Sequence, residues 1–191
     1  MLNYHDFRDI NMKKILLYED REKMKENIKN ICIKMQISLI IIGDNSLNLT
    51  LEEAFNMKCD DLSEHSLFDN SYMLMEEISD ETLTTLLNSL NIEYDGIKVR
   101  HTLHNGTWIL KDLFKETEKE HKLVKKLFIL QERLEECNSL EYSTVSNEKR
   151  HIFQDELLHA FLLLHSKNNN EEEVDASIHL LEEQIKYINK K

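Results

Sequence analysis

The sequence predicts an α+β (or α/β) fold in which a duplicated strand-helix-strand-helix unit forms a four-stranded sheet and a helical C-terminal region follows. Three observations lead to this prediction. Short apolar runs alternate with stretches of helical periodicity in the first two thirds of the chain. That order of elements repeats after about 59 residues. The last third shows helical periodicity alone, which is typical of a helical hairpin or a three-helix extension.

The first unit begins with an apolar stretch at residues 14–18, which predicts a strand. Apolar residues then recur at helical spacing, at Met24, Ile28, Ile31, Cys32 and Met35. The longest apolar run of the chain, residues 37–42, follows this helix and predicts a buried strand. After a turn at residues 43–46, Thr50 and Glu53 match a capping box, so we expect a short helix to begin here.

The second unit repeats these elements in the same order. Residues 72–75 predict a strand, Ser79 a helix cap and residues 97–103 an alternating strand. The helix between them carries a stripe of Leu83, Leu86, Leu87 and Leu90. After a turn at residues 104–107, a further helix is expected to begin with Trp108. The shift of about 59 positions superposes Met24 on Leu83, Ile28 on Leu87, Ile31 on Leu90, Ile40 on Val99, Leu51 on Leu110 and Phe55 on Phe114. We infer an internal duplication.

These patterns divide the chain into four parts. They are an N-terminal extension (1–13), the first unit (14–57), the second unit (72–121) and a helical C-terminal region (122–191). The two units are expected to make one α/β domain, with the polar residues 58–70 as the linker between them. The strand order stays open between a ferredoxin-like and a largely parallel arrangement.

The C-terminal region is expected to contain three helices. One runs from residue 107 to about 137, and polar residues 138–147 then turn the chain. The second carries an apolar stripe of Phe153, Leu157, Ala160, Phe161 and Leu164. The third opens with the acidic residues 171–173 and carries a stripe of Ile178, Leu181, Ile185 and Ile188. Such stripes pack on one another or on a second copy of the chain, and we expect a homodimer.

The composition excludes several classes of protein. A net charge of −12 repels nucleic-acid phosphates and disfavours general nucleic-acid binding. The three cysteines are odd in number and form no Cys-x-x-Cys pair, so we expect reduced thiols. The apolar runs are too short to span a membrane and the N-terminus lacks the apolar segment of a secretory signal, so we expect a cytoplasmic protein without membrane association. Familiar phosphate-binding and hydrolase motifs are absent, and no cofactor is expected.

Three Glu-x-x-His patterns suggest a metal site. They are Glu118/His121, Glu148/His151 and Glu156/His159. Residues three apart share one face of a helix, and carboxylates with imidazoles bind iron or manganese in helical bundles. The candidate metal ligands are Glu148, His151, Asp155 and His159. The last three, however, are expected opposite the apolar stripe of their helix, where a solvated polar face is the simpler interpretation.

The long helix also carries a basic ridge opposite its apolar stripe. The ridge consists of Lys111, Lys115, Lys119, Lys122, Lys126 and Arg133. It fits RNA, an acidic partner or residues 171–173 of the same chain. No aromatic residues interleave with the lysines, so bases have no stacking platform. A solvated face paired with neighbouring glutamates is the alternative.

A small-molecule pocket is expected after the second and fourth strands if the strands run parallel, because ligands gather at the carboxyl ends of parallel strands. Its candidate residues are Asp44, Asn45, Ser46, His101, His104, Asn105 and Trp108. The alternative is that all of them serve turns and helix caps.

A short motif follows the last predicted strand. Asn105-x-x-Trp108 opens a helix, and Glu120-His121 lies near the end of the helical turns that follow. Over about residues 72–121 the chain resembles a small bacterial domain family of unknown function. The resemblance implies a bacterial protein and supports the fold boundary, but it implies no activity and no catalytic residue. The first unit has Leu49 at the position equivalent to Trp108.

Three functions follow from these patterns. The leading prediction is a non-catalytic interaction or regulatory protein that self-associates through its helices. A metal-dependent enzyme using the Glu-x-x-His helices is the first alternative. Binding of nucleic acid or an acidic partner at the basic ridge is the second. No substrate, ligand or catalytic residue is predicted.

Overall fold

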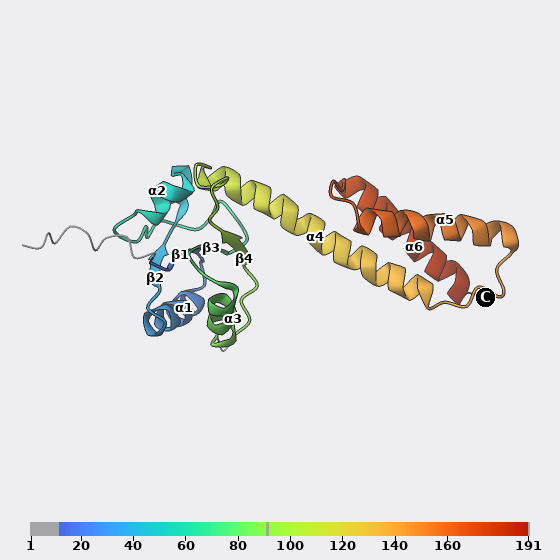
Figure 1. Ribbon diagram of the computed structural model, residues 1–191, viewed down its shortest axis with the longest axis horizontal. Coiled ribbons are helices and arrows are strands. Elements are labelled where there is room, and N and C mark those ends of the chain that lie inside the picture. The colour runs from blue at the N-terminus through green and yellow to red at the C-terminus, as the bar shows by residue number, and fades with distance from the viewer. Residues whose placement is uncertain (1–11, 91, 191) are drawn as a thin grey trace, which may run out of the picture. The chain divides into compact units, whose positions relative to one another are not determined.

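The structure, a computed structural model, describes residues 12–90 and 92–190 (Figure 1). It is α+β, since the described residues form one four-stranded mixed sheet and six α-helices. The chain divides between Glu118 and Lys119 into two compact units, an α/β unit and a helical unit. The expected N-terminal extension lies almost wholly outside the described residues.

Four short strands form the sheet of the α/β unit. They are β1 (Lys14–Tyr18), β2 (Ser38–Ile41), β3 (Tyr72–Glu76) and β4 (Ile97–Arg100). Their order is β2-β1-β3-β4, with β1 parallel to β2, β3 parallel to β4 and the two central strands antiparallel. The sheet therefore follows neither order considered from the sequence, because the pairing of β1 with β3 reverses the strand direction halfway across.

Helices cover both faces of this sheet (Figure 1). They are α1 (Glu22–Lys34), the 3-10 helix η1 (Asp44–Asn48), α2 (Leu51–Phe55), α3 (Asp80–Asn88) and the first turns of α4 (Leu110–Asn138). Successive side chains of a strand point to opposite faces. Ile15 and Leu17 of β1 therefore join one core with residues of α1 and α3, whereas Leu16 joins a second core with residues of η1, α2 and α4.

The two halves of the α/β unit have matching offsets. Strands β1 and β3 begin 58 positions apart, and β2 and β4 begin 59 positions apart. Thr50 and Ile109, also 59 positions apart, face each other in an isolated antiparallel bridge. These offsets agree with the shift expected from the sequence. The duplication itself remains a prediction.

Two helix starts lie where the sequence predicts them, whereas one strand end and one further helix start are displaced. Thr50 and Glu53 form the expected capping box of α2, and Ser79 caps α3. The expected strand at residues 97–103 ends at Arg100, because a turn begins at Thr102. The helix expected from Trp108 begins at Leu110, since the backbone before it pairs with the start of α2.

The helical unit contains the rest of α4 together with α5 (Asn147–Leu164) and α6 (Glu171–Asn189). Its core consists of Leu130, Leu134, Cys137, Ala160, Leu163, Val174, Leu181 and Ile185. Among the helices of residues 12–90 and 92–190, none is both long enough and apolar enough to cross a bilayer.

Candidate functional site

The turn after β2 is held in place by the segment that follows α2. Asp44 accepts hydrogen bonds from the Tyr18 hydroxyl (2.6 Å) and from the backbone N–H and hydroxyl of Ser66 (3.0 and 2.7 Å). Burial alone would raise the pKa of Asp44, but these hydrogen bonds hold that pKa below its ordinary value. The N–H of Asn45 donates to the Ser63 hydroxyl. Both predicted pocket residues therefore serve to fix this loop.

A second carboxylate completes the attachment. Asp61 accepts hydrogen bonds from the N–H and hydroxyl of Ser46 (2.8 and 2.7 Å) and from the N–H of Ser63 (3.0 Å). Burial raises the pKa of Asp61, but these bonds outweigh it and lower the pKa to about 2. Gly43 permits the close approach, since a Cβ there would lie 2.7 Å from the Ser63 carbonyl oxygen. Part of the expected linker thus folds back along the end of β2.

The turn after β4 is also built from its own side chains. The Asn105 side chain accepts from the Thr102 N–H (2.7 Å) and donates to the Arg100 carbonyl (2.8 Å). His104 is exposed, and Trp108 keeps 43% of its surface exposed. The Asn105 contacts are those of a turn-forming residue.

His101 joins the ends of two strands. Its Nδ1 lies 3.2 Å from Oε1 of Glu76, which also pairs with Lys14 at 2.9 Å. The ring centroid lies 5.6 Å from that of Phe55. The Nε2 atom is buried and has no hydrogen-bond partner among the described residues. These contacts connect the residue after β4 to the last residue of β3.

The sheet does not bring the two predicted turns to one end. Asp44 follows β2 and His101 follows β4, and these are the two edge strands. Because β1 and β3 are antiparallel, β2 and β4 run in opposite directions. Their carboxyl ends therefore lie at opposite ends of the sheet, and the parallel geometry on which the expected pocket depended is absent.

An ion pair that the sequence patterns do not reveal lies at the end of β1, with its acid buried and its base exposed. Glu19 is fully buried, and Nε and Nη2 of Arg21 each donate to its carboxylate at 2.8 Å. Burial would raise the pKa of Glu19, but the hydrogen bonds from Arg21 lower it. Arg21 also pairs with Asp95 at 2.9 Å. The carboxylate borders a polar hollow of about 230 Å³, yet its charge is already satisfied by Arg21.

The candidate metal ligands all lie on α5. Glu148, His151, Asp155 and His159 are exposed there. Within residues 12–90 and 92–190, no three His, Cys, Asp or Glu side chains lie close enough together to hold a metal ion. The described part of the chain therefore offers no preformed site for the metal-dependent chemistry considered from the sequence.

Acidic residues of the same chain neutralise much of the basic ridge. Lys126 lies 2.6 Å from both Glu171 and Asp175, and Arg133 lies 2.5 Å from Glu136. Lys115 pairs with Asp112 at 3.4 Å, and Lys119 also has a partner within the chain. Of the interpretations open at the outset, pairing with the start of α6 accounts for Lys126.

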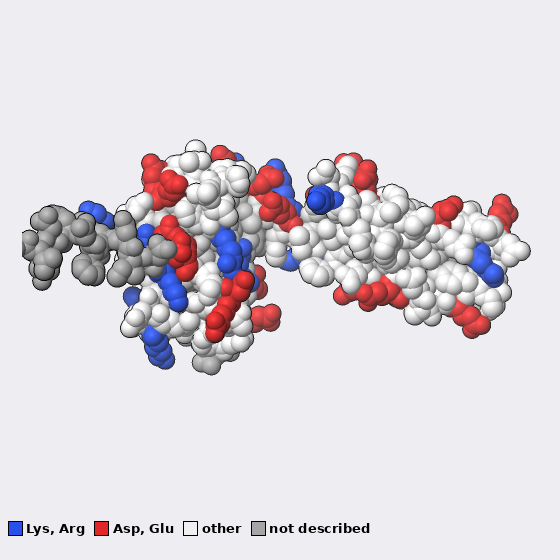
Figure 2. Space-filling view, viewed as in Figure 1, with Lys and Arg blue, Asp and Glu red and all other residues white. Residues whose placement is uncertain are grey.

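The outer side of α5 carries apolar side chains that the helical unit leaves exposed. Leu158, Phe161 and Leu162 are 57%, 50% and 57% exposed, whereas Phe153, Ala160 and Leu163 are buried on the other side. At about 100° per residue the exposed three share one arc, and Asp155 and His165 lie in the same arc. We call Asp155, Leu158, Phe161, Leu162 and His165 the outer α5 surface. Figure 2 shows charged side chains mainly along the edges of the visible face of the helical unit, with uncharged side chains between them.

The sequence predicts Phe161 on one apolar stripe with Phe153 and Ala160, but Phe161 is 50% exposed while the other two are buried. The buried side runs through Ala160 and Leu163, which turns Phe161 outward. The sequence nevertheless indicates that this helix has more apolar surface than one buried face can hold. Apolar residues are adjacent at 157–158 and continuous at 160–164, which is wider than one helix face requires.

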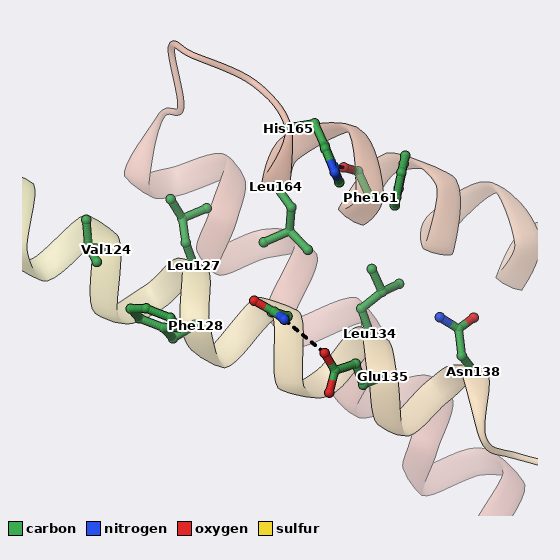
Figure 3. Close-up of a pocket in the computed structure, with 10 residues that line it drawn as sticks. Val124, Leu127, Phe128, Leu134, Glu135, Asn138, Phe161, Leu164 and His165 are labelled. Atoms are coloured by element: carbon green, nitrogen blue, oxygen red, sulfur yellow. Dashed lines mark hydrogen bonds between the residues drawn. The ribbon is translucent and has the colours of Figure 1, made fainter.

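An open groove of about 580 Å³ lies between α4 and α5 beside the outer α5 surface (Figure 3). Leu127 and Leu134 of α4 and Leu164 of α5 point into it. Val124 and Phe128 on α4 are 46% and 64% exposed and extend this apolar area. Its α4 side also includes a polar pair, in which Gln131 donates to Glu135 at 2.9 Å. Phe161 lines the groove as well and connects it to the outer α5 surface.

Comparison of the chain with known protein families, with curated proteins and with solved structures found no match. The resemblance of residues 72–121 to a bacterial domain of unknown function remains a prediction.

Proposed function

We propose that this protein is a non-catalytic interaction protein whose helical unit forms a homodimer through the outer α5 surface and the adjoining groove. One observation carries the proposal. Helix α5 is apolar on two sides, and only the side with Phe153, Ala160 and Leu163 is buried within the chain. An exposed apolar patch of several adjacent side chains on a folded protein commonly marks an interaction surface.

The exposed apolar area is large enough for a reversible dimer. Five side chains, Val124, Phe128, Leu158, Phe161 and Leu162, are between 46% and 64% exposed. Each offers about 100 Å² of apolar surface. Two copies would therefore bury about 1,000 Å², which is below the usual range for stable interfaces and within that of weak, transient ones. Small interfaces are typical of weak, reversible association, and we expect a dissociation constant of about 10 μM.

The distribution of charge favours the helical unit as the site of self-association. Residues 1–118 hold 22 acidic and 13 basic residues, whereas residues 119–191 hold 14 acidic and 11 basic ones. Like charges repel when two copies meet, and that repulsion is weaker between nearly neutral parts. The electrostatic repulsion between two copies is therefore weaker when they meet through the helical unit than when they meet through the α/β unit.

The test compares the mass of variants by size-exclusion chromatography with light scattering. Leu158→Gln/Leu162→Gln removes the centre of the outer α5 surface, and we expect only the 22.8 kDa monomer. Leu180→Gln is the matched control, since Leu180 is 43% exposed but lies on α6, and we expect it to dimerise as the wild type does. Equal masses for all three proteins would overturn the proposal.

We also propose that the α/β unit arose by duplication of a strand-helix-strand-helix unit. The offsets of 58 and 59 positions between corresponding strands support this proposal. The bridge between Thr50 and Ile109 supports it further, because two equivalent positions meet there as they would at a twofold axis. Separate expression of residues 12–57 tests it, and self-pairing of that half into a dimer is the expected result.

A further inference from the structure

The inference concerns how two α5 helices meet, and it rests on the self-association proposed above. Asp155, Leu158, Leu162 and His165 follow one another at spacings of three, four and three residues. This is the spacing of the a and d positions that line the seam of a coiled coil. All four side chains are exposed. Helix α5 thus presents a short, unpartnered seam with leucines at its centre and ionisable groups at its ends.

We propose that α5 pairs antiparallel with the α5 of a second copy, with Leu158 opposite the partner's Leu162 and Asp155 opposite the partner's His165. The pairs 155/165 and 158/162 share residue 160 as their midpoint. One twofold axis at the level of Ala160 therefore places all four layers in register. A twofold interface has to be self-complementary in this way, because each copy contributes the same residues.

The side chains at the two ends of the seam favour antiparallel over parallel pairing of the helices. His165 is the residue that ends α5, and its Nδ1 lies 2.8 Å from the Phe161 carbonyl oxygen. A carbonyl only accepts, so Nδ1 carries a proton and Nε2 is left to meet a partner. In the antiparallel pairing this Nε2 lies at the level of the partner's Asp155 carboxylate, whereas in a parallel pairing it would meet a second imidazole.

A parallel pairing would lose this complementarity. It would place Asp155 opposite the partner's Asp155, and two carboxylates that face each other are destabilising. The antiparallel pairing instead forms the same Asp-His contact twice, once at each end of the leucine layers. It also brings Phe161 of both copies together near the axis, because this residue flanks the seam on the side of the groove.

A charge exchange tests the register. Asp155→Lys removes the carboxylate that faces the partner's His165, and His165→Glu places two carboxylates opposite one another, so we expect each to weaken dimerisation about tenfold. The double variant Asp155→Lys/His165→Glu restores opposite charges, so we expect its dissociation constant to return to within about threefold of the wild type. Glu172→Lys on α6 makes the same change of charge outside the seam and serves as the control.

Cross-linking tests the direction of pairing in the full chain. Cys59 is exposed, so Cys59→Ser is introduced first, while Cys32 and Cys137 are buried. We expect a short bis-maleimide to link Asp155→Cys chains to His165→Cys chains when the two are mixed, and to link neither variant to itself, because equal positions of the two copies then lie about 15 Å apart along the helix axis. Self-linking of each variant alone would indicate parallel helices and would overturn the proposed register while leaving self-association intact. A wild type that stays at 22.8 kDa would overturn both.

Discussion

Thr50 and Ile109, which lie 59 positions apart, face each other in an antiparallel bridge that joins the two halves of the α/β unit. The N–H of Leu51 donates to the Trp108 carbonyl, and the N–H of Leu110 donates to the Leu49 carbonyl. The bridge therefore fixes the starts of α2 and α4 relative to each other. Both helices contribute to the same core on one face of the sheet.

The capping box beside this bridge is the first test of local stability. The Thr50 hydroxyl accepts from the Glu53 N–H at 3.2 Å, and the Glu53 carboxylate accepts from the Thr50 N–H at 2.8 Å. We expect Thr50→Ala to lower the free energy of unfolding by about 1 kcal/mol, because one amide of α2 loses its acceptor. Thr50→Ser keeps the hydroxyl and should stay near wild type. Urea unfolding measures both, and equal losses would contradict the role of the cap.

The Glu19–Arg21 pair predicts a larger effect. Arg21→Met leaves the fully buried Glu19 carboxylate without its main partner, and because the Arg21 side chain is 41% exposed we expect a loss of about 2 kcal/mol in the free energy of unfolding. Glu19→Gln/Arg21→Met removes the unpaired charge and should recover most of that loss. Guanidinium unfolding at neutral pH compares the two variants. If the double variant is no more stable than Arg21→Met, the unpaired Glu19 charge is not the cause of the lost stability.

Asp61 predicts a dependence of stability on pH. Its pKa is about 2 in the folded protein against 3.8 for an ordinary aspartate. A lowered pKa contributes stability above the unfolded value and loses it as the pH falls through the folded value. We expect Asp61→Asn to be about 2 kcal/mol less stable than wild type at neutral pH, with the difference vanishing between about pH 4 and pH 2. Urea unfolding over that range measures it, and a constant difference would refute it.

The three cysteines should differ in reactivity. Burial raises the pKa of Cys32 and Cys137 to about 11, while Cys59 is exposed. Because the thiolate is the reactive form, we expect only Cys59 to react quickly with a disulfide reagent in the native protein. Cys59→Ser should abolish this fast phase, and the two remaining thiols should react only after denaturation. Rapid reaction at more than one position would show that the cores around α1 or α4 are open.

Elements set by local pattern were predictable from the sequence. The periodicity from Met24 to Met35 located α1, and Thr50 with Glu53 located the start of α2. The strand order was not predictable, because it depends on the pairing of β1 with β3, more than 50 residues apart. The same holds for the hydrogen bonds that attach Asp44 and Asp61, which join side chains 15 to 26 positions apart.

For the candidate site, the sequence did not predict which side of α5 would be exposed. Helix α5 has apolar residues on two sides, and periodicity alone cannot tell which side the chain itself covers. The packing of Ala160 and Leu163 decides this and leaves Leu158 and Leu162 outside. The histidines and Asp155 of this helix suggested a metal site from the sequence. In the structure Asp155 and His165 instead flank an exposed apolar surface.

Sedimentation equilibrium of the full chain tests the central claim most directly. With a dissociation constant of about 10 μM, the average mass should rise from 22.8 kDa towards twice that value as the concentration passes from about 1 to 100 μM. A mass that stays at 22.8 kDa over this whole range would contradict the account, since the apolar side of α5 would then remain uncovered in solution.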